Sequence, residues 1–139
     1  MTTDEITGSC LCGEVRYRVH PPFTWFHYCH CSRCRKRNGA AHSANILVEA
    51  EQVEWLAGGE QAGRWELPGA KAFSTAWCTR CGSALPWTTK NGRWIVVPAG
   101  GLDVDPGARP QRNIFWESRA VWYTHAAELP TFAELPPRE

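Results

Sequence analysis

The chain has 139 residues, 43% of them hydrophobic, so it is long enough for one domain with its own core. Its 15 basic and 14 acidic residues nearly cancel, which argues against a protein that mainly binds nucleic-acid phosphates. No apolar run approaches the roughly 18 residues of a membrane span, and the opening MTTDEITGSC lacks the features of a signal peptide. We therefore expect a cytoplasmic protein with no membrane partner.

The hydrophobic pattern predicts a mainly β domain built of short antiparallel strands. Residues 14–19 alternate between polar and apolar side chains, as a half-buried strand does. Asn91-Gly92 is a strong hairpin signal between two apolar segments. The segments that suggest strands are, in chain order, 14–19, 42–48, 53–56, 84–89, 93–97, 114–116 and 120–123. We expect one domain over residues 1–139, with its core at about 5–125 and a short C-terminal tail.

Helical signals are few. Ser32 is placed to cap, and Gly39 to end, a helix of one or two turns over residues 32–37. A second short turn is predicted near residues 129–135. The eight tryptophans are predicted mostly to fill the core, with a few forming the wall of a pocket.

Seven cysteines in a chain of this length require an explanation. In a reducing cytosol, clustered cysteines are more often metal ligands or catalytic groups than disulfides. An odd number also leaves one cysteine unpaired in any complete disulfide scheme. Metal binding is the better interpretation.

Two of the cysteine motifs form a matched set. In SCLCG and CTRCG the second cysteine is followed by a glycine, Gly13 or Gly82, which suits a turn around a metal where a positive φ is needed. The four cysteines, Cys10, Cys12, Cys78 and Cys81, would make a closed tetrahedral structural zinc site that fastens the N-terminal strand to a distant hairpin. The alternative is that they are ordinary buried thiols.

The three remaining cysteines are Cys29, Cys31 and Cys34, in CHCSRC. Three protein ligands with a vacant fourth position are typical of catalytic zinc, so we predict a second, more labile zinc site here. Two alternatives remain open. A histidine, among His27, His30 and His42, could complete the site as a structural one, or Cys31 and Cys34 could form a metal-free redox pair.

Charged residues beside the triple are candidates for substrate binding. Arg33, Arg35, Lys36 and Arg37 could lower thiol pKa values or meet the carboxylates of a substrate, with Arg35 and Arg37 as weak candidates, although a solvated helix face is the simpler interpretation. His30 is a candidate proton carrier, against a structural role. Zinc held by three thiolates suits binding a thiolate or an aldehyde oxygen better than generating hydroxide.

Five ordered blocks carry a family resemblance along nearly the whole chain. They are GSCLCGEVRYRV, YCHCSRCRKRNGA, WCTRCGSAL, VPAGGLDVDP and ESRAVWY followed by LPTF. In these blocks the chain resembles the glutathione-dependent formaldehyde-activating enzymes, a group that includes the centromere-protein-V-like proteins. The resemblance implies a zinc-stapled β-tent fold. It also implies a carbon–sulfur lyase reaction that joins glutathione to formaldehyde.

The resemblance assigns structural zinc to the first cysteine set and catalytic zinc to the second. It implies a small-molecule thiol such as glutathione as the partner. One departure is Asn113, where many members of the family carry a histidine. Two other functions remain open from the residues alone: a non-catalytic zinc-binding interaction module, and a thiol-redox protein that uses Cys31 and Cys34.

Overall fold

The computed structural model describes residues 5–138, and most of their regular structure is β. The strands are β1 (Ile6–Ser9), β2 (Arg16–Val19), β3 (Trp25–Cys29), β4 (Ser43–Glu49), β5 (Val53–Ala57), β6 (Ala62–Glu66), β7 (Ser74–Cys78), β8 (Trp87–Thr88), β9 (Trp94–Pro98) and β10 (Arg112–Ile114). One α-helix, α1 (Ser32–Asn38), occurs in this part of the chain. The 3-10 helices span Ala50–Gln52, Gly59–Gln61, Ala99–Gly101, Trp116–Ser118 and Ala126–Glu128. The predicted mainly β class is confirmed.

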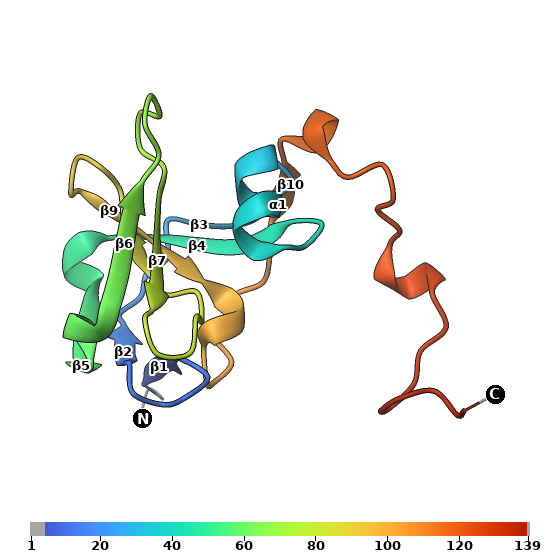
Figure 1. The fold of residues 1–139 in the computed structure, drawn as a ribbon, viewed down its shortest axis with the longest axis horizontal. Helices are drawn as coiled ribbons and strands as arrows, with labels where there is room; N and C mark the ends of the chain where they lie inside the picture. The colour runs from blue at the N-terminus through green and yellow to red at the C-terminus, as the bar shows by residue number, and fades with distance from the viewer. Residues whose placement is uncertain (1–4, 139) are drawn as a thin grey trace.

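Three small sheets enclose the core (Figure 1). The first has the strand order β1-β2-β5, the second β10-β3-β4-β9-β8, and the third pairs β6 with β7. All these pairings are antiparallel except that of β10 with β3. The predicted hairpin around Asn91-Gly92 is present, with Trp87 opposite Val96. Strands β1, β3, β6 and β7 were not predicted.

The core lies between the sheets and is mainly aliphatic. Tyr17, Val19, Ile46, Val48 and Val97 are each at most 1% exposed and belong to one cluster. The prediction that tryptophans fill this core is wrong. All eight tryptophans lie in the described part of the chain, and none is fully buried. Trp87 packs against the core while partly exposed, and Trp55, Trp65, Trp116 and Trp122 are exposed. A large ring with a polar N–H suits such partly exposed positions.

Helix α1 begins directly after β3. Its N-cap is Cys31, whose Sγ accepts a hydrogen bond from the backbone N–H of Cys34 at 3.3 Å, so the prediction of Ser32 as the cap is wrong. A thiolate or thiol can replace a hydroxyl here because the free N–H groups of the first turn need only an acceptor. The predicted stop at Gly39 is confirmed.

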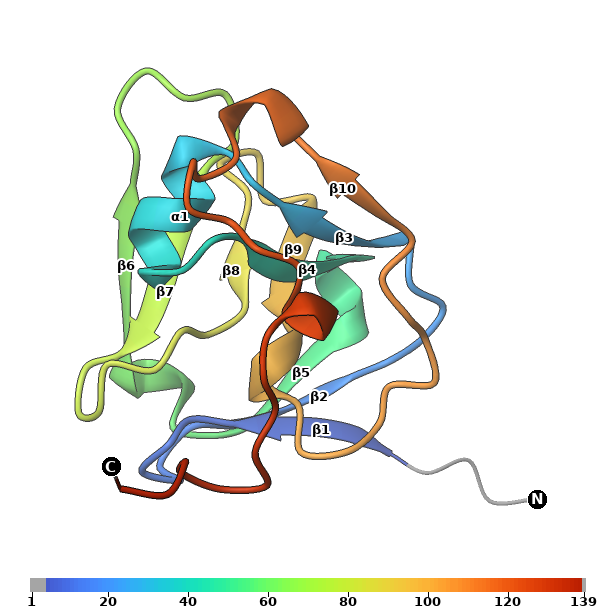
Figure 2. The same ribbon diagram turned by 90° about the vertical axis from the view of Figure 1, so that its right-hand side faces the viewer.

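The C-terminal segment differs from its prediction. Residues 114–116 and 120–123 do not form a strand pair. Phe115 adopts a left-handed conformation (φ 54°), which ends β10 at Ile114 and leads into the 3-10 helix Trp116–Ser118. The helical turn expected near 129–135 occurs instead at Ala126–Glu128. After the 3-10 helix Trp116–Ser118 the chain runs down across the face of the domain that is turned to the viewer in Figure 2, and Tyr123 on this segment packs against His30 and His42. No helix in residues 5–138 has the length and apolar character needed to span a bilayer.

Candidate metal centres

The four predicted structural cysteines come together where two distant turns meet. Cys10 and Cys12 lie in the turn after β1, Cys78 ends β7, and Cys81 lies in the turn that follows. All four sulfurs lie within 4.8 Å of one another. The Sγ atoms of Cys10 and Cys12 are 3.5 Å apart, and those of Cys12 and Cys78 are 3.9 Å apart. Four sulfurs at 2.3 Å from a tetrahedral zinc are about 3.8 Å apart, so the donor set fits such an ion.

The glycines of both motifs have the backbone conformation that the sequence predicts. Gly13 has φ 82° and Gly82 has φ 79°. Each donates its N–H back to the first cysteine of its pair, Gly13 to the Cys10 carbonyl at 3.0 Å and Gly82 to the Cys78 carbonyl at 2.7 Å. These tight turns point both sulfurs of a pair to one side. Residues other than glycine rarely adopt such φ values, which explains why a glycine follows each cysteine pair.

Hydrogen bonds favour thiolate character at Cys81 and Cys10. At Cys12 a backbone hydrogen bond at Glu14 is outweighed by burial and the neighbouring thiols, which raise the pKa to about 11. The hydroxyl of Ser83, 3.2 Å from Cys81 Sγ, and the Ser83 backbone lower the pKa of Cys81 to about 5. Although burial opposes the shift, the N–H of Val15 and the neighbouring thiols lower the pKa of Cys10. A cysteine must be deprotonated to bind metal, so these contacts suit a ligand set.

The second cluster is built at the junction of β3 and α1. Cys29 ends the strand, Cys31 caps the helix and Cys34 lies in its first turn, and their three sulfurs lie within 4.8 Å of one another. Cys29 and Cys34 are buried, whereas Cys31 is half-buried. Hydrogen bonds, first from the thiol of Cys29 and then from that of Cys34, lower the pKa of Cys31, while the same contacts raise the pKa of Cys29. The thiol whose pKa is lowered, that of Cys31, is also the least buried of the three.

No histidine of the described chain joins this cluster. His27 stacks on Trp25 at 4.2 Å between ring centroids, and burial followed by the charge of Arg112 lowers its pKa. His42 contacts the Ser43 carbonyl through Nδ1 at 3.0 Å. The cluster thus consists of three sulfurs, and none of the histidines considered as a fourth ligand lies in it. All seven cysteines are free, including Cys31 and Cys34.

His30 lies in a closed aromatic environment. It is completely buried, and its Nε2 is 2.9 Å from Asn113 Oδ1. The rings of His42, Trp116 and Tyr123 surround it at centroid distances of 4.9, 5.0 and 5.3 Å. This position favours the structural role over that of a proton carrier, because no solvent reaches the ring. Asn113, the departure from the family pattern, is therefore the group that orients His30.

A cleft of about 810 Å³ opens over the three cysteines. Its volume lies within the range of roughly 300–1,000 Å³ that is typical of small-molecule sites. One wall comes from the loop joining β6 to β7, which rises at the top of Figure 1. The other comes from the start of α1 and from residues 114–118. Aromatic side chains of Trp25, Phe73 and Trp87 line it.

The basic run divides between several roles. Arg33 lines the cleft together with Lys71, a residue that sequence reasoning missed. Arg35 and Arg37, the weak candidates for substrate binding, do not line it. Arg37 instead donates to the Ala76 carbonyl at 2.7 Å and ties α1 to β7, and burial lowers its pKa. The run is therefore not a continuous basic surface.

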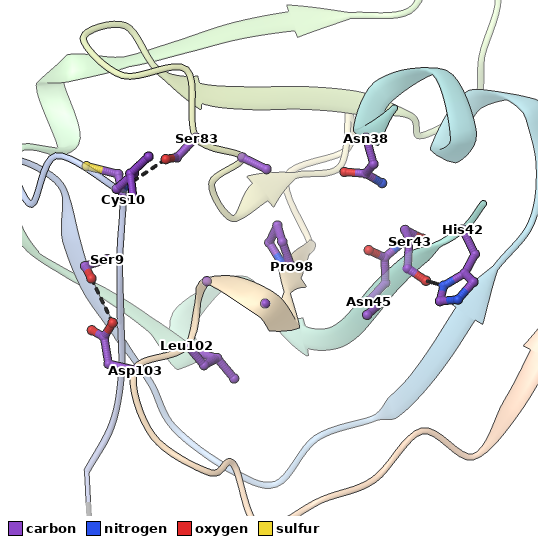
Figure 3. A pocket seen from close by; sticks show the side chains of 15 residues that line it. Ser9, Cys10, Asn38, His42, Ser43, Asn45, Ser83, Pro98, Leu102 and Asp103 are labelled. Atoms are coloured by element: carbon purple, nitrogen blue, oxygen red, sulfur yellow. Dashed lines mark hydrogen bonds between the residues drawn. The ribbon is translucent and has the colours of Figure 1, made fainter. Parts of the chain in front are cut away.

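A second, more polar cavity of about 630 Å³ lies between the four-cysteine cluster and the end of α1 (Figure 3). Ser9 and Asp103 close one side through a 2.8 Å hydrogen bond, and Asn38 and Asn45 face them across the cavity. Of the cysteines, only Cys10 lines it. Because it does not reach the three-cysteine cluster, the 810 Å³ cleft is the better candidate for a site of thiol chemistry.

Comparisons with known proteins give one consistent family. The sequence profile described as "Glutathione-dependent formaldehyde-activating enzyme" matches residues 5–118. A protein of Halomonas elongata, provisionally named as a glutathione-dependent formaldehyde-activating enzyme, is 33% identical over 130 residues, which cover 84% of this chain and 78% of that protein. A crystal structure of a Rhodobacter sphaeroides protein matches with a TM-score of 0.59 and 22% identity, over 75% of this chain and 97% of that chain. This last likeness supports the fold alone.

Proposed function

Because the chain belongs to the family of glutathione-dependent formaldehyde-activating enzymes, we propose that it joins a thiol to a small aldehyde at the three-cysteine cluster. The reactants are glutathione or a related thiol, and formaldehyde or a related aldehyde. A carbon–sulfur bond forms, the carbonyl π bond breaks, and the thiol proton ends on the new hydroxyl oxygen. The reverse reaction breaks the same carbon–sulfur bond, so the reaction class is that of a carbon–sulfur lyase.

Both cysteine clusters are proposed to hold zinc. Cys10, Cys12, Cys78 and Cys81 would hold a structural ion with all four positions filled. Cys29, Cys31 and Cys34 would hold a second ion with one position left for substrate. When bound there, zinc supplies a Lewis acid that stabilises a thiolate or an aldehyde oxygen.

The observation that carries this proposal is the place of the three sulfurs at the base of a cleft large enough for a small molecule. Asn45 Nδ2 lies 3.9 Å from Cys34 Sγ, where its N–H points to the sulfur and steadies it. Of the three thiols, Cys31 is the one whose pKa its neighbours lower. The rings of Trp25, Phe73 and Trp87 line the same cleft and offer an apolar surface beside the sulfurs. Reacting groups held in fixed positions react faster than in free solution.

The test is turnover of glutathione with formaldehyde by zinc-replete protein. Exchange between free glutathione and its hydroxymethyl adduct, followed by NMR, is expected to run well above the uncatalysed rate. It should fall to that rate when a chelator removes the more labile zinc and recover when zinc is restored. If two zinc ions are bound and no thiol–aldehyde pair exchanges faster than background, the proposed function is wrong.

A further inference from the structure

The walls of the 810 Å³ cleft differ from what glutathione requires. This inference rests on the proposed function and names the thiol class of the same site. We propose that the preferred thiol has an apolar body and a carboxylate but no ammonium group. Glutathione itself carries two carboxylates and one ammonium, so it matches this description only in part.

Apolar surface dominates the cleft. The rings of Phe73 and Trp87 lie 5.3 Å apart between centroids and form one continuous face, and Trp25 lies on β3 beside them. All three are half-buried, so part of each ring remains open to a ligand. Val96 and Leu47 add aliphatic surface to the same wall. An apolar group placed there would leave water, which is the main source of affinity in small-molecule sites.

Two cations stand on this otherwise apolar lining. Arg33 and Lys71 are both exposed, and neither forms a salt bridge with any residue of the described chain. By contrast, Arg18, Arg64 and Arg80 each meet a carboxylate. The Arg33 guanidinium lies 6.0 Å from the centroid of the Phe73 ring, so cation and apolar face are adjacent. A ligand carboxylate next to an apolar group complements this pair.

The cleft offers an ammonium no comparable partner. Among its lining residues that the structure describes there is no aspartate or glutamate, and apart from Arg33 and Lys71 the polar side chains are neutral hydroxyl and amide groups, those of Ser32, Asn45, Thr89 and Ser118. The ligand's own sulfur would occupy the end of the cleft that Cys29, Cys31 and Cys34 line. Arg33 and Lys71 would also repel a second cation.

Backbone carbonyls of the β6–β7 loop are already engaged. Lys90 Nζ donates to the carbonyls of Leu67 at 2.6 Å and Ala70 at 2.7 Å, and its backbone N–H donates to that of Ala72 at 3.3 Å. These bonds fix the loop and occupy the carbonyls of Ala70 and Ala72, two of the loop residues that line the cleft. An unpaired charge in an apolar cleft is unfavourable, so the ammonium of glutathione should weaken binding.

A series of ligands on one Cys-Gly frame separates these contributions. The series starts from glutathione and continues with N-glutaryl-Cys-Gly, N-(3-phenylpropanoyl)-Cys-Gly and the C-terminal amide of the last. The first step removes the ammonium, the second replaces the acyl carboxylate by a phenyl group, and the third removes the remaining carboxylate. Their S-methyl forms cannot react, so quenching of tryptophan fluorescence reports binding independently of turnover. We expect the S-methyl phenylpropanoyl ligand to bind at least about tenfold more tightly than S-methylglutathione, and amidation to weaken it about tenfold.

Substitutions of the two lining cations test whether they cause the loss of affinity on amidation. In Arg33→Ala/Lys71→Ala the penalty for amidation should disappear, whereas Lys36→Ala, on the same helix but outside the cleft, should keep it. Circular dichroism verifies that each variant is folded. Equal or tighter binding of S-methylglutathione, or an amidation penalty that survives the double substitution, overturns the inference.

Turnover by the free thiols distinguishes the two proposals. If the phenylpropanoyl ligand binds best but no thiol exchanges with any aldehyde, the proposed function fails and the ligand class stands. If glutathione turns over faster than the phenylpropanoyl thiol, the function stands and the ligand class is wrong.

Discussion

Substitution of Cys81 by serine is expected to abolish soluble folding or to strip zinc from the four-cysteine cluster. Cys78 and Cys81 lie at the end of β7 and in the turn that follows, and Cys10 and Cys12 lie in the turn after β1. All four sulfurs lie within 4.8 Å of one another. Zinc in such a site contributes roughly 10–16 kcal/mol of apparent folding free energy. A small domain has a net stability of only about 5–15 kcal/mol. A serine hydroxyl remains protonated at neutral pH and replaces the thiolate poorly, so the loss should exceed what the core can offset.

The measurement is zinc per chain together with thermal melting for wild type and Cys81→Ser. Cys31→Ser, in the other cluster, is the matched control because it makes the same chemical change. It should lose one zinc and keep its melting transition. A Cys81→Ser protein with full zinc content and native melting would show that these four cysteines do not share a structural ion.

Substitution of Cys31 by serine should eliminate thiol–aldehyde turnover while the fold stays intact. Cys31 contributes the thiolate that Cys29 and Cys34 stabilise, and its loss leaves two ligands, too few to hold zinc against water and free thiol. The rate should fall about 100-fold or more, to background. The helix should survive because Cys31 is its N-cap, and serine is among the preferred N-cap residues. Stability should change by no more than about 1 kcal/mol.

Rates of NMR exchange and melting curves decide this prediction. Lys36→Ser is a suitable control, because it introduces the same residue on the same helix outside the cleft. It should retain the wild-type rate. If Cys31→Ser also retains it, the three-cysteine cluster is not the catalytic centre.

The sequence predicted best those parts of the fold that depend on local signals. Alternation of polar and apolar residues located β2, Asn91-Gly92 located a hairpin, and Gly39 ended the helix. Strand β10 was misplaced because a parallel pairing with β3 is a long-range contact with no local pattern. The tryptophans were misjudged because hydrophobicity alone does not show whether an indole lies inside the core or at its margin.

The candidate site divides in the same way. Cysteine spacing and the trailing glycines predicted both clusters, because each ligand pair or triple is a local motif. The cleft wall was not predictable, since Trp25, Phe73 and Trp87 come from three separate strands or loops and no spacing connects them. Lys71 was missed for the same reason. The sequence also selected Arg35 and Arg37 over Arg33, because the direction of a side chain on a short helix depends on what the helix packs against.

Stepwise removal of zinc, with metal counted per chain against circular dichroism, tests the central claim most directly. That claim is one closed structural site and one open site beneath the cleft. We expect two zinc ions per chain at the start. A mild chelator should take the first ion with loss of turnover and no change in the spectrum, because three ligands bind less tightly than four. The second ion should leave only with collapse of the fold. Loss of both ions together with the native spectrum would contradict the account.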